Sequence, residues 1–219
     1  MKVLLFGASG MIGQGVLLEC LKRSDVTQVL AVGRTSVPQK DPKLKDVLVK
    51  DLTDFSQVGD AFDGVDAVLY CLGVSSGGMK EADYRRITYD FTMAAAKAIF
   101  AKSPGAVFCF ISGASTDSTE QTGPMWARVK GAAENALQKV GFKAVYCFRP
   151  GAIEPMDGIV SKTPSYKWMY VVMKPFWFML RGLSKYVTST RQLGFAMVEV
   201  AKKGYSKTIL ESVDINAVK

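Results

Sequence analysis

"LLFGASGMIGQGVLLEC", residues 4–20, begins as an apolar strand and ends as an amphipathic helix. Gly7, Gly10 and Gly13 occupy the turn between the two, with the spacing G-x-x-G-x-x-G. Gly7 allows a tight turn, Gly10 lets a phosphate approach the backbone, and Gly13 lets the helix pack closely on the strand. The N-terminus of the helix presents free N–H groups and a partial positive charge. The stretch therefore predicts a site for the pyrophosphate of a dinucleotide, although such glycines also form plain turns.

The rest of the chain repeats this alternation of short apolar runs and helix-length amphipathic stretches. The predicted strands are 3–6, 28–34, 46–54, 66–73, 105–112 and 143–151, and the predicted helices are 12–22, 56–62, 82–101 and 124–140. Strands that are apolar on both faces, each followed by a helix, are typical of a parallel sheet covered on both sides. The sequence therefore predicts an α/β doubly wound parallel sheet, the Rossmann fold, over residues 1–155. Residues 156–219 are expected to form a small helical C-terminal segment with a last strand near "TILESVDI", packed on the core as one domain.

Composition narrows the chemistry of the protein. The 219 residues include no histidine, which excludes serine–histidine hydrolysis and histidine-ligated zinc, and no metal site is expected. Four isolated cysteines, Cys20, Cys71, Cys109 and Cys147, are expected to be buried free thiols. The apolar run of "MKVLLFG" is too short for a signal peptide, so we expect a cytoplasmic protein. The net charge of +8 is dispersed along the chain, and no nucleic-acid partner is expected.

The end of the second strand indicates which dinucleotide is bound. NAD-binding proteins usually carry an acidic residue there, which bonds the ribose hydroxyls of the adenosine. Here "VGRTS" places Arg34 and Thr35 at that point, and a guanidinium can bind the 2′-phosphate of NADP through two hydrogen bonds. NADP is therefore the expected cofactor, with NAD the alternative if Arg34 is a plain surface residue. Asp51 and Leu52 are expected near the adenine, unless Asp51 caps a helix that starts at Thr53.

Six segments occur in the order found in one enzyme superfamily: "GASGMIG" (7–13), "DLTD" (51–54), "CLG" (71–73), "FISGAS" (110–115), "WARVKGAAE" (126–134) and "FRPGAIEP" (148–155). Over residues 3–155 the chain resembles the short-chain dehydrogenase/reductase superfamily in its extended or atypical branch, and within it small epimerase-like or NmrA-like proteins. The resemblance implies nicotinamide-dependent chemistry on a small molecule that the sequence does not specify.

Active reductases of this superfamily carry a Tyr-x-x-x-Lys pair on one helix face, where the tyrosine exchanges the substrate proton and the lysine holds the nicotinamide ribose. In this chain Lys130 matches the lysine, but Trp126 stands in place of the tyrosine. An indole N–H donates a hydrogen bond but does not exchange a proton near neutral pH. The usual proton relay is therefore not expected.

The resemblance also implies the remaining site residues. Candidates for catalysis are Lys130, Ser112 and Ser115, with Tyr89, or Tyr84 beside it, as a substitute acid; both tyrosines can instead be packing residues, and Ser112 can simply satisfy its turn. The implied cofactor contacts are Gly7, Ser9, Gly10, Met11, Ile12, Gly13, Arg34, Thr35, Asp51, Leu52, Leu72, Gly73, Val74, Lys130, Pro150, Gly151 and Ile153. Arg149 can pair within the core instead of contacting a ligand.

The stretch "PSYKWMYVVMKPFWFMLRGLSKY", residues 164–186, is rich in aromatic residues and carries lysine or arginine every seven residues. It can cap a substrate pocket, form a dimer face, or contact an anionic membrane surface through residues 166–183, and charge interrupts it too often for a convincing membrane span. A homodimer through the helices 82–101 and 124–140 is a further expectation, by family habit.

Three classes of function remain open at this point. The first is an NADP-dependent oxidoreductase or epimerase-like enzyme with a nonstandard proton donor, acting on an unknown small substrate for which the aromatic stretch suggests an apolar compound. The second is a redox-silent regulatory protein that binds NADP(H), and the third is a membrane-peripheral assembly or scaffold protein that retained the fold. Trp126 favours the second and third classes, while the glycine turn and Lys130 keep the first open.

Overall fold

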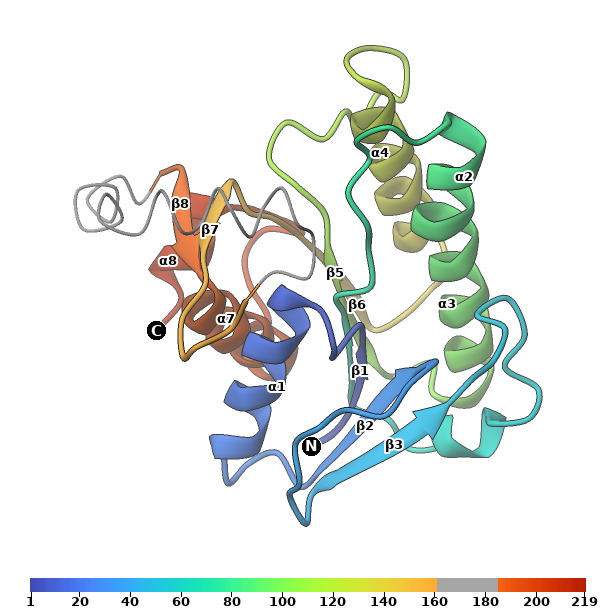
Figure 1. Ribbon diagram of the computed structural model, residues 1–219, viewed down its shortest axis with the longest axis vertical. Coiled ribbons are helices and arrows are strands. Elements are labelled where there is room, and N and C mark those ends of the chain that lie inside the picture. The colour runs from blue at the N-terminus through green and yellow to red at the C-terminus, as the bar shows by residue number, and fades with distance from the viewer. Residues whose placement is uncertain (161–184) are drawn as a thin grey trace.

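The computed structural model describes residues 1–160 and 185–219, and it contains one large parallel sheet with helices on both faces (Figure 1). In the described part of the chain the sheet has seven strands in the order β3-β2-β1-β4-β5-β6-β9, and all neighbours are parallel. The order reverses direction between β1 and β4, which is where ligands bind in doubly wound sheets. The predicted Rossmann fold is confirmed.

The elements follow the predicted alternation. The strands of the large sheet are β1 (Lys2–Phe6), β2 (Gln28–Gly33), β3 (Leu44–Leu48), β4 (Ala67–Tyr70), β5 (Val107–Ile111), β6 (Ala144–Arg149) and β9 (Ile209–Glu211). The helices are α1 (Met11–Lys22), the short 3₁₀ helix η1 (Gly59–Phe62), α2 (Glu81–Arg85), the π-helical turn η2 (Arg86–Asp90), α3 (Phe91–Lys102), α4 (Met125–Gln138), α7 (Thr190–Lys203) and α8 (Ser212–Ala217). A second, two-stranded parallel sheet pairs β7 (Ala152–Glu154) with β8 (Val187–Ser189).

The large sheet separates two apolar cores, because alternate residues of each strand face opposite sides. Helices α1 and α7 cover one face, where Val3, Leu5 and Leu193 are fully buried (Figure 1). Helices α2, α3 and α4 lie on the other face, whose core contains Phe6 and Phe108. Both faces of β4 and β5 are buried, which explains why these strands are apolar throughout.

Two predicted elements are wrong in their extent. The third strand was expected at 46–54 but spans Leu44–Leu48, because Asp51 turns the chain by accepting hydrogen bonds from Thr53 N–H and Oγ. The helix expected at 56–62 shrinks to the four residues of η1, and no helix begins at Thr53 for Asp51 to cap. The helix expected at 82–101 is observed as one helical run over 81–102 that contains the π turn η2.

The C-terminal residues contribute to the same sheet. The predicted last strand is β9, which pairs with β6 at the edge, and the rest of "TILESVDI" begins helix α8. Helix α7 lies against α1, and the two helices approach closely at glycines: a Cβ on Gly15 would lie 2.7 Å from Cβ of Thr190, and one on Gly194 would lie 3.0 Å from the carbonyl oxygen of Gly15. The described C-terminal residues therefore cover one face of the sheet and extend its edge.

Candidate functional site

The turn between β1 and α1 has the tight geometry that its glycines predict. Gly7 adopts a φ of +75°, and a Cβ there would lie 2.7 Å from the backbone of Cys71 on the neighbouring strand's end. A Cβ on Gly13 would overlap the carbonyl oxygen of Gly7, which itself accepts a hydrogen bond from Gly10 N–H (2.9 Å). Helix α1 begins at Met11 with no side-chain cap and no acidic residue in its first turn. The first N–H groups of α1, including those of Met11 and Ile12, are thus left for an anionic ligand.

A cleft of about 370 Å³ opens beside this turn. It is lined by Gly7, Ala8, Ser9, Ala31, Val32, Gly33, Arg34, Thr35, Val37, Leu52 and Leu72. Six of these residues were predicted as cofactor contacts from the sequence: Gly7, Ser9, Arg34, Thr35, Leu52 and Leu72. The other lining residues, Ala8, Val37 and the end of β2 (Ala31, Val32 and Gly33), were missed.

The lining fits the adenosine half of a dinucleotide. Leu52 is buried and offers an apolar wall, while Arg34 and Thr35 are exposed at the end of β2. No carboxylate lines this cleft within the described ranges, so nothing there repels a phosphate on the ribose. Arg34 forms no ion pair with another described residue, which leaves its five N–H donors for a ligand or for water.

Other predicted cofactor contacts lie at the same sheet edge but outside the cleft. Gly73 and Val74 follow β4 directly after Leu72, and both are exposed. The carboxylate of Asp51 is engaged with Thr53, and these hydrogen bonds lower the pKa of Asp51. Asp51 therefore stabilises the turn after β3.

The end of β5 carries the predicted serines. Ser112 is buried, and its hydroxyl lies 3.0 Å from Oγ1 of Thr116, which in turn donates to the carbonyl of Gly113 (2.8 Å). Ser115 is exposed and adopts a positive φ of 66°, so its side chain does not join this pair. Ser112 satisfies its turn, as one of the two interpretations of the sequence proposes.

Helix α4 brings Trp126 and Lys130 to the same strand end. The indole of Trp126 covers the loop after β5, since a Cβ on Gly113 would lie 3.7 Å from the ring. One turn along the helix, Lys130 Nζ donates to the carbonyl oxygen of Ile111 (3.2 Å) and lies 5.5 Å from the ring centre of Phe110. Burial lowers the pKa of Lys130 to about 8, against a smaller opposite effect of Glu134. The Lys130 ammonium therefore gives up its proton at a lower pH than an exposed lysine does.

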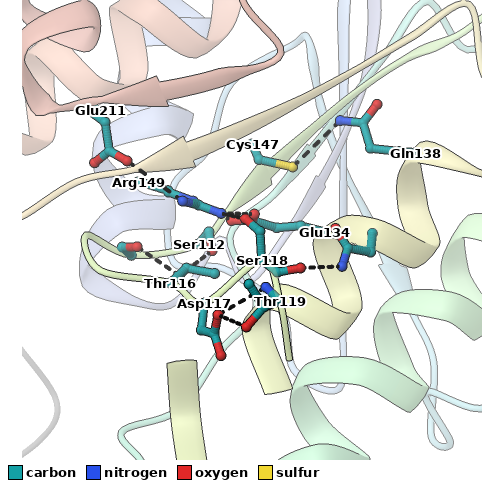
Figure 2. Close-up of polar contacts among 12 residues, drawn as sticks. Ser112, Thr116, Asp117, Ser118, Thr119, Glu134, Gln138, Cys147, Arg149 and Glu211 are labelled. Carbon is teal, nitrogen blue, oxygen red and sulfur yellow. Dashed lines mark hydrogen bonds and ion pairs between the residues drawn. The ribbon is translucent and has the colours of Figure 1, made fainter. Parts of the chain in front are cut away.

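Arg149, at the end of β6, holds α4 to the loop after β5 (Figure 2). Its Nε and Nη2 donate to the two carboxylate oxygens of the buried Glu134 (2.9 and 2.5 Å), and Nη2 also donates to Ser118 Oγ (2.6 Å). Asn135 Nδ2 donates to the carbonyl of Ser118 (2.9 Å), and a Cβ on Gly131 would overlap the carbonyl of Asp117. Arg149 pairs within the core, and the loop that carries Ser112 and Ser115 is fixed onto the helix that carries Lys130.

The turn after β6 lies beside the turn after β5, because Ala114 N–H donates to the carbonyl oxygen of Pro150 (3.0 Å). Gly151 N–H already donates to Ser212 Oγ (2.9 Å), and a Cβ on Gly151 would overlap the carbonyl oxygen of Tyr186. Ile153 is buried in β7. In the structure Gly151 and Ile153 therefore make packing contacts, and their predicted contact with the cofactor remains a prediction.

The two tyrosines offered as substitute acids do not line the cleft. Tyr84 belongs to α2 and is buried, at 2% exposure. Tyr89 stacks against the guanidinium of Arg85 (4.2 Å) and lines a separate groove of about 470 Å³ between α3 and α4, together with Phe100 and Val140. This arrangement favours the packing interpretation of both residues. The groove lies between the two helices at which the sequence predicts a homodimer, which stays a prediction.

Several further expectations can be placed. Residues 166–183, expected to contact a membrane, a partner or the pocket, lie outside the described residues. Within 1–160 and 185–219 no helix combines the length and hydropathy needed to cross a membrane. The four cysteines are free, with Cys20, Cys109 and Cys147 buried and Cys71 partly buried.

Comparison with known proteins identifies the family. A family model described as NAD(P)H-binding matches residues 7–162. The chain belongs to this NAD(P)H-binding family. Protein HTATIP2 of Rattus norvegicus is 26% identical over 155 residues, a match that covers 69% of this chain but 62% of the relative. This chain thus matches less than two thirds of the relative's length.

Several solved structures share the fold of this chain. Aldohexose dehydrogenase of Thermoplasma acidophilum, in ligand-free form, has a TM-score of 0.71 against this chain. The sequence identity is 12%, and the match covers 99% of this chain and 94% of the dehydrogenase. An oxidoreductase of the short-chain dehydrogenase/reductase family from Burkholderia thailandensis reaches 0.65, with 16% identity over 99% and 92%. MoeE5 in complex with UDP-glucose and NAD reaches 0.69, with 16% identity over 96% and 75%. The family model and the shared fold bear out the predicted resemblance as far as a Rossmann-fold protein of an NAD(P)H-binding family, and the nicotinamide cofactor follows from the family model.

Proposed function

We propose that this member of the NAD(P)H-binding family uses NADP(H) and acts as an oxidoreductase or epimerase-like enzyme on a small molecule. The observation that carries the cofactor choice is the cleft at the end of β2, where Arg34 and Thr35 stand and no described carboxylate lines the wall. A phosphate on the adenosine ribose would accept charge-assisted hydrogen bonds from Arg34. A ribose without that phosphate finds no carboxylate to bind its hydroxyls.

The chain's own groups have distinct roles in this proposal. The N-terminus of α1 and the Gly7–Gly13 turn bind the pyrophosphate, and Leu52 and Leu72 contribute apolar surface to the cleft. Lys130 binds the nicotinamide ribose from the end of β5, as the family resemblance implies. The bound nicotinamide supplies hydride transfer, and the protein orients the substrate against it. The substrate's class is that of small carbonyl or hydroxyl compounds.

A second candidate is supported by one specific observation. Trp126 occupies the position of the family's proton-exchanging tyrosine, one helical turn before Lys130. A protein of this kind can bind NADP(H) as a sensed or structural ligand without turnover. Consumption of NADPH with any member of a broad panel of aldehydes and ketones supports the enzyme; tight binding with no turnover across the panel supports the redox-silent protein.

The experiment that tests the cofactor choice is thermal unfolding with NADPH, NADP, NADH and NAD. A ligand that binds the folded state raises the unfolding midpoint by mass action. We expect larger shifts with the two phosphorylated forms, and we expect the difference to disappear in Arg34→Ala. Lys139→Ala is the matched control, because it removes one exposed positive charge from a different face of the molecule. Equal shifts with all four ligands in the wild-type protein contradict the proposed preference.

A further inference from the structure

The site lacks the proton-exchanging residue that its family resemblance leads one to expect, and the structure shows what stands there. Trp126 packs its indole over the loop after β5. The hydroxyl of Ser112 is buried against Thr116, and alcohols of this kind do not ionise near neutral pH. Tyr84 and Tyr89 lie away from the cleft. Within residues 1–160 and 185–219, the remaining candidate donors for this site are the groups at the ends of β5 and β6 and on the adjoining face of α4.

Among the described groups at this edge, most are unable to donate. Arg149 stays charged at all relevant pH values, and it binds the carboxylate of Glu134 through two hydrogen bonds. Cys147, on β6, is buried, and burial raises the pKa of its thiol. Of these described groups, only Lys130 has a proton that can exchange near neutral pH and lies within ion-pair distance of no described carboxylate. Its Nζ donates to the carbonyl oxygen of Ile111.

The position of Lys130 also suits a proton carrier. It projects from α4 to the carboxyl end of β5, and the ligand-binding crevice of a doubly wound sheet lies at the carboxyl ends of its strands. Its Nζ lies over the ring of Phe110, and the residue is partly buried, so the amine is partly shielded from water. The groups that face it are the carbonyl of Ile111 and the thiol of Cys147 from the sheet, and Glu134 from its own helix. Shielding from water favours the neutral amine, which a general acid must become after it has given up its proton.

We propose that Lys130 exchanges the substrate proton itself, in place of the tyrosine that Trp126 replaces; this inference rests on the proposed function. In the direction of reduction, a bound reduced dinucleotide would supply the hydride to the carbonyl carbon. The Nζ–H bond of Lys130 breaks, an O–H bond forms at the former carbonyl oxygen, and the lysine is left as a neutral amine. Water then returns one proton to Nζ. In the direction of oxidation the neutral amine accepts the hydroxyl proton, so atoms and charge balance both ways.

The first test needs no cofactor and no substrate. The intact chain is labelled with ¹³C at the lysine ε-carbons, and the lysine signals are followed by NMR from pH 6.5 to 10.5. We expect one signal to titrate with a midpoint at about 8. That signal should be missing from Lys130→Arg, which keeps a cation and the hydrogen bond to the strand. The matched control Lys139→Arg should lose a different signal. A Lys130 signal that titrates together with the bulk of the lysines overturns the proposal.

The second test links the proton to cofactor binding. Calorimetric titration with NADP at pH 8 in two buffers of different ionisation heat measures the protons released on binding. The positive charge of the oxidised nicotinamide ring disfavours an ammonium beside it, so we expect release of up to about half a proton per site in the wild-type protein and none in Lys130→Arg. Binding without proton release overturns the role of Lys130 but leaves the proposed function standing. Absence of binding contradicts the proposed function, and the NMR titration still decides whether Lys130 is a proton carrier.

Discussion

The ion pair between Arg149 and Glu134 offers the sharpest test of how this site is held together. Both residues are nearly buried, at 8% and 2% exposure, and two hydrogen bonds of 2.9 and 2.5 Å join them (Figure 2). In Arg149→Met, Glu134 loses both donors and remains in the interior. Removal of one partner of a buried pair costs about 3–5 kcal/mol. We expect the lower end, about 3 kcal/mol, because beside the guanidinium Ser118 is exposed to water and Glu211 is partly exposed.

The assay is urea unfolding at pH 7. With a urea dependence of about 2–3 kcal/mol per M, a loss of about 3 kcal/mol lowers the midpoint by about 1–1.5 M. Arg191→Met is the control: its pair with Asp157 is exposed, so its loss should cost no more than about 1 kcal/mol. The double variant Arg149→Met/Glu134→Leu should recover most of the loss, since it leaves no buried charge. If Arg149→Met is no less stable than Arg191→Met, the pair does not hold α4 to its loop and the reasoning is refuted.

Two further predictions concern the first βαβ unit. In Gly13→Ala the added Cβ overlaps the carbonyl oxygen of Gly7. The free energy of unfolding, measured in urea, should therefore fall by about 1–3 kcal/mol, and dinucleotides should bind more weakly. An unchanged stability and affinity would show that the turn accommodates a methyl group. Asp25 accepts hydrogen bonds from Arg23 and Lys202, which hold its pKa well below its usual range. Its stabilising effect is present above its usual pKa near 4 and is lost as the pH falls below it, so between pH 5 and 2 the wild-type chain should lose more stability than Asp25→Asn. Parallel stability curves for the two proteins would contradict this.

The sequence predicts the fold well where local signals agree with the tertiary environment. The apolar strand and the glycine spacing of residues 4–20 locate β1, the turn and α1 almost to the residue, because packing against Cys71 and within the turn permits little else. The third strand was placed too far along the chain. Apolar residues continue through Val49 and Leu52, but the side chain of Asp51 bends the backbone there. Strands of three residues, such as β7 and β8, carry too few side chains to show a periodicity.

The sequence likewise predicts one part of the candidate site and misses another. The residues that line the cleft lie close to the strand ends in the sequence, so the position of each strand is enough to predict them. The direction in which a helical side chain points is a tertiary property, which is why Tyr89 was offered as an acid although it faces the groove between α3 and α4. The pairing of Arg149 with Glu134 was left open for the same reason. The two residues are 15 positions apart and meet only after β6 has joined the sheet beside α4.

The most direct measurement of the central claim is the dissociation constant of NADPH and of NADH for the wild-type chain, determined by calorimetry at the same salt concentration. Hydrogen bonds to a charged group contribute about 1.5–3 kcal/mol, which corresponds to a preference for NADPH of about 10- to 150-fold if Arg34 binds the 2′-phosphate. This preference should fall to within about threefold in Arg34→Ala and persist in Lys139→Ala. Equal affinities in the wild-type protein, or tighter binding of NADH, would contradict the account of the cleft as an NADP site.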